Sequence, residues 1–241
     1  MNNRKQKDEE MPILEHVQEL RNRILSTLCI FTLSLSLCLL YTKDIALILQ
    51  QPALGIKFLQ LAPGEYLFVS IKISIYLAFI LSSPFALYNI LKFISPGLTQ
   101  KESNYILPTT ISSLILFFLG TIFSYKILIP VTLNFFINYG SEIIEPVWSF
   151  DEYFNFISIT IFTTGFCFQL PIIQIILGST NIVKWENMLK NWRYITFIAT
   201  VISAIITPST DPITQLFMTA TLLVLYFSGI IVVRTIKMSK S

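Results

Sequence analysis

Six long apolar runs, divided by short polar segments, constrain this chain more than any other feature of its sequence. The runs cover 24–42, 69–90, 106–130, 154–178, 194–207 and 213–233. A helix needs roughly 20 apolar residues to cross about 30 Å of hydrocarbon, and most of the runs approach that length. We therefore expect an all-α polytopic membrane protein with six transmembrane helices, in which the last two spans are short.

The lysines and arginines fall almost entirely on alternate sides of these runs, and this pattern predicts the topology. With the N-terminus inside, the inner segments hold thirteen of the 17 basic residues: Arg4, Lys5, Lys7, Arg21, Arg23, Lys92, Lys101, Lys184, Lys190, Arg193, Arg234, Lys237 and Lys240. Only Lys43 and Lys57 fall in outer loops, while Lys72 and Lys126 lie within expected spans. The positive-inside rule therefore favours both termini on the cytoplasm-like face of the membrane.

Composition agrees with this interpretation. A hydrophobic fraction of 54% and a mean hydropathy of +0.68 exceed the values usual for soluble domains. The net charge of +3 comes from bases that flank the spans, so we expect no nucleic-acid partner. We divide the chain into an N-terminal tail with an interfacial amphipathic helix (1–23), a six-helix transmembrane domain (24–233) and a short basic C-terminal tail (234–241).

The residues that usually carry catalysis or bind cofactors are scarce. The single histidine, His16, cannot build a zinc site of the HExxH type, and the eight glycines form no phosphate-binding or dinucleotide-binding motif. Cys29, Cys38 and Cys167 form no CxxC pair, and we interpret them as small apolar side chains in the packing. We therefore expect no enzymatic activity, no catalytic residue, no metal and no cofactor.

The segment 11–23 carries the first polar pattern that needs an explanation. Its apolar residues recur at helical spacing, which predicts an amphipathic helix on the inner interface that leads into the first span. The opposite face carries Glu15, Glu19 and Arg23 at intervals of four residues. A solvated helix with a weak Glu19–Arg23 ion pair would explain this face without any function.

Two further polar segments lie in the loops. In 92–102, the tripeptide at 95–97 predicts a turn, and Glu102 then falls near the start of the third helix, where the helix dipole favours an acid. In 207–212, two prolines and Asp211 predict a tight turn between the last two runs. Each feature also has a plain structural explanation, a dipole contact for Glu102 and a simple hairpin for 207–212.

The fourth run contains polar residues within the membrane. Pro171 removes one backbone hydrogen bond from a helix, and Gln169 brings a donor and an acceptor into an apolar setting. A kinked helix whose Gln169 bonds to a neighbouring helix would account for both residues.

Taken together, these segments resemble the TatC family, the multispanning core of the twin-arginine protein translocase. The matching pieces are HVQELRNR at 16–23, KFISPGLTQKE at 92–102, FQLPIIQIILG at 168–178 and TPSTDPITQ at 207–215. They occur in the family's order, and the similarity covers about residues 11–235. The amino-acid sequences of the last two pieces are most like those of plastid and cyanobacterial members.

The resemblance implies a function and a location. Members of the family recognise signal peptides with paired arginines and help to move folded proteins across a membrane, driven by the proton-motive force. The implied partners are these signal peptides, single-span subunits of the TatA and TatB types, further copies of this chain in a receptor complex, and the lipid membrane. The implied location is the plastid thylakoid membrane, with both termini in the stroma, or alternatively the bacterial inner membrane.

The resemblance also assigns roles to residues. Glu19 and Glu102 match the acids that bind the arginine pair. We expect Glu15 to add to their negative charge, and Phe93 and Pro96 to shape the loop. Arg21 and Arg23 are expected either to tether Glu19 or to hold the interfacial helix at the lipid headgroups. Further positions implied to contact partners or to serve function are Gln169, Pro171 and Asp211. Many bacterial members have Glu where this chain has Gln169, so a proton-accepting carboxylate is missing at that position.

Two other functions fit a six-span protein. A secondary transporter for a small solute would need a polar site near the midplane, usually with ionisable residues, and the expected spans offer no clear acid–base pair. An insertase or assembly scaffold without signal selectivity would be indifferent to the arginine pair.

Overall fold

The structure of the chain is a computed structural model that describes residues 13–94, 106–139, 147–180, 182–206 and 212–238. Its elements in chain order are α1 (Ile13–Leu40), α2 (Thr42–Gln50), β1 (Lys57–Leu59), α3 (Glu65–Ile94), α5 (Ile106–Phe123), α6 (Ile129–Tyr139), β2 (Val147–Ser149), α7 (Phe150–Cys167), α8 (Leu170–Ser179), α9 (Trp185–Lys190), α10 (Trp192–Ile206) and α11 (Pro212–Met238). A short 3-10 turn follows α2, and a π-helical turn joins α5 to α6.

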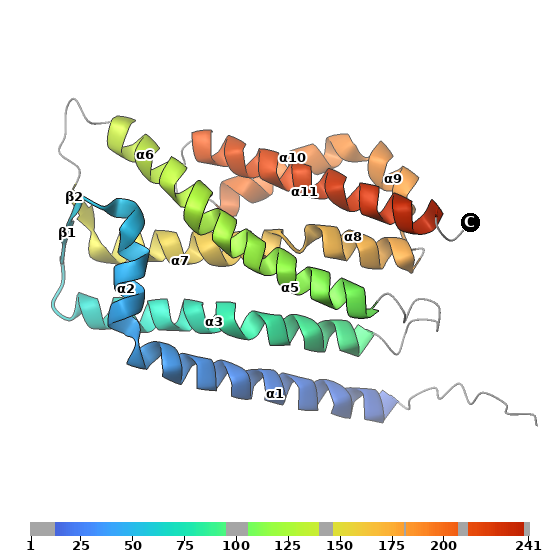
Figure 1. The fold of residues 1–241 in the computed structure, drawn as a ribbon, viewed down its shortest axis with the longest axis horizontal. Coiled ribbons are helices and arrows are strands. Elements are labelled where there is room, and N and C mark those ends of the chain that lie inside the picture. The colour runs from blue at the N-terminus through green and yellow to red at the C-terminus, as the bar shows by residue number, and fades with distance from the viewer. Residues whose placement is uncertain (1–12, 95–105, 140–146, 181, 207–211, 239–241) are drawn as a thin grey trace, which may run out of the picture.

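Five helical stretches of the described chain are long and apolar enough to cross a membrane, and α10 is a shorter apolar helix. Helices are expected here because a bilayer offers no water to pair with backbone N–H and C=O groups. The N-terminal end of α1 and the C-terminal end of α11 lie at the same end of the molecule (Figure 1). The expected all-helical, polytopic membrane protein is thereby confirmed.

The lengths of the last two spans differ from each other. The helix α10 has 15 residues and rises only about 22 Å, as its short apolar run indicated. The expectation of a short sixth span was wrong, because α11 has 27 residues and rises about 40 Å. The helix continues beyond the apolar run through Arg234 and Lys237, whose long side chains suit the end of a span.

The helix α1 runs without a break across residue 23. The expected boundary between an interfacial helix and the first span is therefore not a helix end. The segment ELRNRIL contains no proline or glycine, so nothing in it interrupts the backbone hydrogen bonds of the helix. Arg23 and Glu19 also pair along the helix surface. The amphipathic segment from Ile13 and the apolar run that follows it therefore form one continuous helix.

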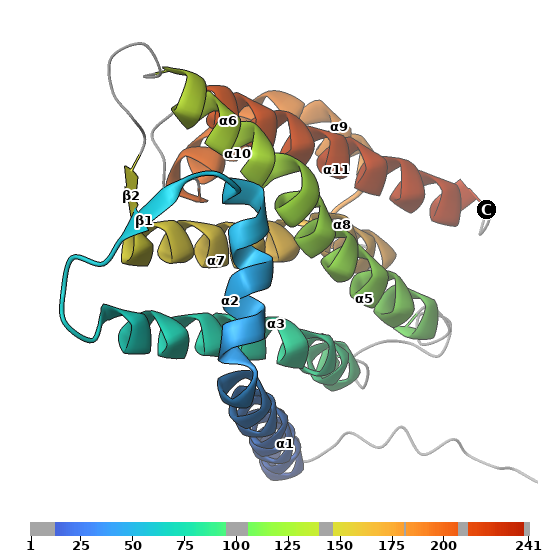
Figure 2. The same ribbon diagram turned by 60° about the vertical axis from the view of Figure 1, so that its left-hand side comes forward.

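A small cap closes one end of the bundle and was not expected from the sequence. The helix α2 crosses the bundle after α1, and β1 pairs in parallel with β2 from the segment before α7 (Figure 2). The Tyr153 hydroxyl donates to the carbonyl of Leu49 at 2.8 Å, and Glu65 accepts backbone N–H bonds from Leu61, Ala62 and Asp151 at 2.5–3.0 Å. These bonds fasten the loops to α3 and α7.

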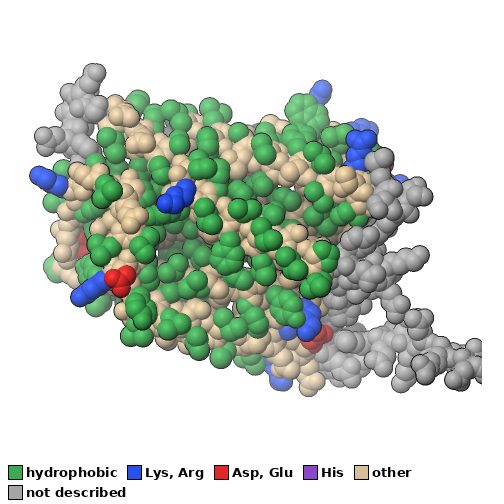
Figure 3. Space-filling view, in the orientation of Figure 1, with side chains coloured by type: hydrophobic (Ala, Val, Ile, Leu, Met, Phe, Trp, Pro, Cys, Tyr) green, Lys and Arg blue, Asp and Glu red, His purple; other side chains and the backbone are tan. Residues whose placement is uncertain are grey.

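The helices pack as a series of neighbours: α1 lies on α3, α3 on α7, α7 on α5, α8 on α11, and α11 on α10. The largest buried cluster lies between α2, α3, α6 and α7 and includes Ile73, Ile129 and Phe154. By contrast, α1 leaves most of its leucines exposed, and Figure 3 shows a face that is mainly hydrophobic, with most of its basic side chains towards its ends. This surface is suited to contact with lipid.

Candidate functional site

A polar cluster joins α1 to α3 near the end of the bundle at which α1 begins. Arg23 pairs with Glu19 one turn earlier, donating Nε and Nη2 to the same carboxylate oxygen, with the Nε contact at 3.0 Å. Its Nη1 reaches across to the carbonyl of Asn89 at 3.3 Å. The Asn89 amide in turn donates to Thr27 at 3.0 Å and Ser26 at 3.4 Å. Arg23, which has contacts on both helices, therefore orients the carboxylate of Glu19.

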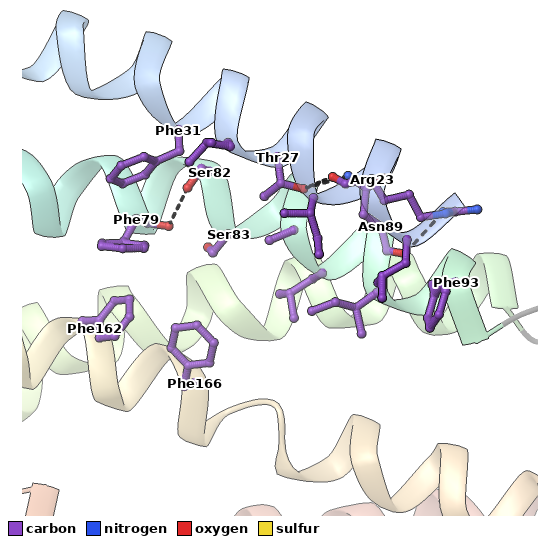
Figure 4. Close-up of a pocket in the computed structure, with 16 residues that line it drawn as sticks. Arg23, Thr27, Phe31, Phe79, Ser82, Ser83, Asn89, Phe93, Phe162 and Phe166 are labelled. Carbon is purple, nitrogen blue, oxygen red and sulfur yellow. Dashed lines mark hydrogen bonds between the residues drawn. The ribbon is translucent and has the colours of Figure 1, made fainter. Parts of the chain in front are cut away.

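An apolar groove of about 540 Å³ begins beside this cluster and is lined by α1, α3 and α7 (Figure 4). Arg23, Asn89 and Phe93 lie at one end of the groove, and aromatic rings line the other. The rings of Phe31 and Phe79 have centroids 4.5 Å apart. The groove can therefore accept an extended or helical apolar segment whose polar end meets Glu19 and Arg23.

The hydroxyl groups in the groove are already bonded to backbone carbonyls. Ser82 donates to Phe79 at 3.3 Å, Ser83 to Ile80 at 2.7 Å, and Thr27 to Arg23 at 2.8 Å. Hydroxyls that are paired in this way leave the walls effectively apolar. No carboxylate lines the groove, and the part of the chain that the structure describes contains no group of His, Cys, Asp and Glu residues able to hold a metal ion.

The fourth span is interrupted between α7 and α8, where Gln169 forms a two-point contact with α5. The Ser113 hydroxyl donates to Gln169 Oε1 at 2.6 Å, and Gln169 Nε2 donates to the Ser113 carbonyl at 3.1 Å. Pro171 follows in the first turn of α8, where a proline costs no helical hydrogen bond. Phe168 packs directly on Gly120, where any side chain would come within 2.7 Å of its ring. The amide of Gln169 is thus satisfied within the chain.

The structure describes only part of the site expected from the sequence. Phe93 lines one end of the groove, and Glu19 is paired with Arg23, which lines the same end. Of the two arginines expected as possible tethers of Glu19, Arg23 has this role, while Arg21 is exposed and forms no ion pair among the described residues. The loop residues Pro96 and Glu102, the hairpin residue Asp211 and the side chain of Glu15 lie outside the described residues. The ends of α3 and α5, which flank the loop of Glu102, lie at the same end of the bundle as the start of α1 (Figure 1).

Sequence reasoning missed Asn89 and Ser113, which fix Arg23 and Gln169. Each is a polar residue inside an apolar run, and that placement was the available clue. It also missed Gln174 of α8, which is buried against Gly229 of α11 and whose amide has no hydrogen-bond partner in the described chain. The three cysteines are free thiols.

Comparison with known proteins identifies the fold and the family together. The family model for the Sec-independent protein translocase protein TatC matches residues 15–220. The chain belongs to the TatC family. It is thus a subunit of a Sec-independent translocase, in a family that is not enzymatic, as expected from its motifs.

Similar proteins come from plastids and cyanobacteria. An uncharacterised TatC-like protein, ycf43, from Gracilaria tenuistipitata var. liui is 58% identical over 93% of this chain and 94% of its own length. The TatC protein of Synechocystis sp. is 45% identical over 94% and 89% of the two chains. The chloroplastic TATC of Pisum sativum is 45% identical over 92% of this chain and 64% of its own.

The fold is also that of TatC. A crystal structure of the twin arginine translocase receptor TatC in the detergent DDM matches with a TM-score of 0.81 and 32% identity, covering 90% of this chain and 98% of the other. This TatC-family chain is therefore a multi-pass membrane protein, whose described residues contain five helical stretches long enough to cross a membrane and the shorter apolar helix α10.

Proposed function

We propose that this protein is the signal-peptide receptor and core scaffold of a twin-arginine translocase. It binds signal peptides with paired arginines and supports transport of folded proteins across the membrane, driven by the proton-motive force. The observation that carries the proposal is the carboxylate of Glu19, held by Arg23 at the mouth of an apolar groove. The similar crystal structure is itself that of a twin arginine translocase receptor.

The chemistry of Glu19 suits an arginine. A carboxylate has about four acceptor positions, and a guanidinium can donate to it with two parallel N–H bonds. Lysine has the same charge but lacks the planar fork, so a site of this kind discriminates between the two. Only 25% of the Glu19 side chain is exposed, and charge-assisted bonds in such a setting contribute about 1.5–3 kcal/mol each.

The groove suits the rest of a signal peptide. Signal peptides carry a basic segment followed by an apolar one of about 7–15 residues. With the basic segment at Glu19, the apolar segment lies along Phe93, Thr27 and Phe79 towards the middle of the membrane. One ligand then uses both the polar cluster and the aromatic end of the groove.

The remaining site residues complete this proposal. Glu102 supplies the second carboxylate from the loop between α3 and α5, and Pro96 shapes that loop together with Phe93. Glu15 adds negative charge to the site. Arg21, which is exposed, contacts lipid headgroups rather than Glu19.

We further propose that TatA-type and TatB-type single-span subunits and other copies of this chain assemble around the bundle. Gln169 and Pro171 shape the fourth span for these contacts, and Asp211 acts in the outer hairpin. Plastid and cyanobacterial relatives support a thylakoid location with both termini in the stroma.

Photo-cross-linking tests whether the groove holds the signal peptide. A photoreactive residue replaces Ile90, which lines the groove, and in a matched variant it replaces Ile231, an exposed residue of α11. A twin-arginine signal peptide is expected to cross-link at position 90 and only weakly at 231. Equal cross-linking at both positions, or cross-linking at 231 alone, would contradict the proposed path of the peptide.

A further inference from the structure

Lys126 is an unusual residue for a transmembrane span. It lies in the π-helical turn Ser124–Leu128, where the N–H of Ile129 bonds to the carbonyl of Ser124, and Pro130 follows directly. A proline at this point cannot donate to the carbonyl of Lys126, so the regular helical ladder is disturbed there. The side chain is exposed and has no acidic partner in the described part of the chain.

A second apolar groove, of about 260 Å³, opens beside Lys126. It lies between α2, α3, the π-helical turn and α7, and its walls include Ile48, Ile73, Tyr76, Ile122 and Ile161. It is separate from the groove beside Glu19, with which it shares no lining residue. Nearly all of its surface is hydrocarbon or aromatic, so an acyl chain is a suitable occupant.

Tyr125, which lines this groove next to Lys126, contacts α2 and the turn that follows it. The hydroxyl of Tyr125 donates to the carbonyl of Ile48 at 2.6 Å and lies 3.4 Å from the amide oxygen of Gln51. The ammonium group of Lys126 lies 5.4 Å from the centre of the Tyr125 ring. These groups sit beside α2, which crosses the end of the bundle opposite the start of α1 (Figure 1).

We propose that Lys126 and this groove form a binding site for one anionic membrane lipid of the outer leaflet. An acyl chain lies along Ile122 and Ile73, and the negatively charged headgroup pairs with the Lys126 ammonium, with Gln51 as a further polar contact. The apolar walls of the groove thus match the acyl chain, and the Lys126 ammonium matches the anionic headgroup. A lysine on a lipid-facing span is costly unless it reaches the interface or finds a counter-charge, and the headgroup supplies that charge.

The site differs from two other basic positions at this end of the molecule. Lys72 is paired with Asp151 at 2.6 and 3.0 Å, so its charge is already balanced. Lys43 of α2 is exposed but lines no part of the groove. Lys126 therefore combines a charge without an acidic partner in the described chain with an adjoining apolar surface.

Native mass spectrometry of the purified full-length protein tests the proposal. Phosphatidylglycerol, or phosphatidylcholine of the same chain length, is added to the protein in detergent. The detergent is then removed in the mass spectrometer, and the number of lipid molecules that remain bound to each protein is measured. We expect wild-type protein to retain phosphatidylglycerol about fivefold better than phosphatidylcholine, the preference that one interfacial lysine confers. Lys126→Gln should abolish that preference, whereas Lys126→Arg and the control Lys43→Gln should keep it.

A variant of the groove provides an independent readout. Ile122 is exposed and lines the groove, so Ile122→Trp fills it while Lys126 remains. Retention of both lipids should then fall. Wild-type preference in Lys126→Gln, or unchanged lipid retention in Ile122→Trp, would overturn the proposal. Because the groove is remote from Glu19, signal-peptide binding is expected to persist in both variants, so the two proposals fail independently.

Discussion

Gln169 and Ser113 exchange two hydrogen bonds between the fourth and third spans, and both residues are buried. The chain thus has at this position a neutral amide whose oxygen and nitrogen are both used. A buried amide costs far less than a buried charge, provided that it is paired. The pair fixes the break between α7 and α8 against α5 at the point where Phe168 also packs on Gly120.

Removing one partner of this pair should cost more than removing both. Ser113→Ala deprives Gln169 Oε1 of its hydroxyl donor, and we expect the free energy of unfolding to fall by about 1–3 kcal/mol. Adding Gln169→Leu removes the stranded oxygen and should recover part of that loss. Chemical denaturation in a mild detergent, followed by helical circular dichroism, measures both. Single and double variants of equal stability would show that the pair contributes nothing.

Local contacts could be predicted at this scale, but contacts between helices could not. The Glu19–Arg23 pair follows from a spacing of four residues, which places two side chains on the same helix face. The contacts of Arg23 with Asn89 and of Gln169 with Ser113 depend on how two helices are rotated and how deep each sits. A run of apolar residues does not encode that rotation.

At the level of elements, the close contact between α8 and α11 depends on glycine. A methyl group at Gly229 would overlap with the side-chain oxygen of Gln174 and lie 3.0 Å from the Cα of Pro171. Gly178 faces Val233 in the same interface, and a side chain there would also overlap with its neighbour. Small residues allow helices in a membrane to approach closely, and these two hold the second half of the broken span against α11.

Substitution at Gly229 tests this packing. Gly229→Ala should lower the free energy of unfolding by about 1–3 kcal/mol, because the interface has no room for a methyl group. Gln174→Ala in the same protein removes the overlapping amide and should restore much of the stability. Thermal unfolding in detergent compares the variants. If Gly229→Ala unfolds at the wild-type temperature, or Gln174→Ala restores nothing, the interface is looser than described.

Several elements could not be predicted from the apolar runs. The helix α2 and the parallel pair of β1 and β2 lie in segments between the apolar runs, and they form through contacts with α3 and α7 that are remote in sequence. The sixth span was underestimated because its last turns are basic. The short α10 was predictable because its apolar run is short and is followed by Pro208.

At the level of the whole molecule, topology gathers the expected site at one end. Alternating spans bring the start of α1, the end of α3 and the start of α5 to the same end of the bundle (Figure 1). Glu19 therefore lies at the end from which the loop of Glu102 emerges, although 83 residues separate them in sequence. The apolar runs predicted this arrangement, because which ends of the helices lie together depends only on how many times the chain crosses the membrane. The distribution of lysine and arginine predicted that this end faces the inside.

In the proposed receptor, Glu19 and Glu102 bind the paired arginines of a signal peptide. The most direct measurement is the affinity of the purified protein for a twin-arginine signal peptide and for its twin-lysine form, with Glu19→Ala, Glu102→Ala and the control Glu186→Ala. Glu186 is an exposed acid of α9 away from the groove. We predict that wild type and Glu186→Ala bind the twin-arginine form at least about tenfold more tightly than the twin-lysine form, as expected for the loss of one charge-assisted bond. Glu19→Ala and Glu102→Ala are predicted to lose this selectivity. Equal affinity for both peptides in wild type, or full selectivity in both alanine variants, would contradict the account.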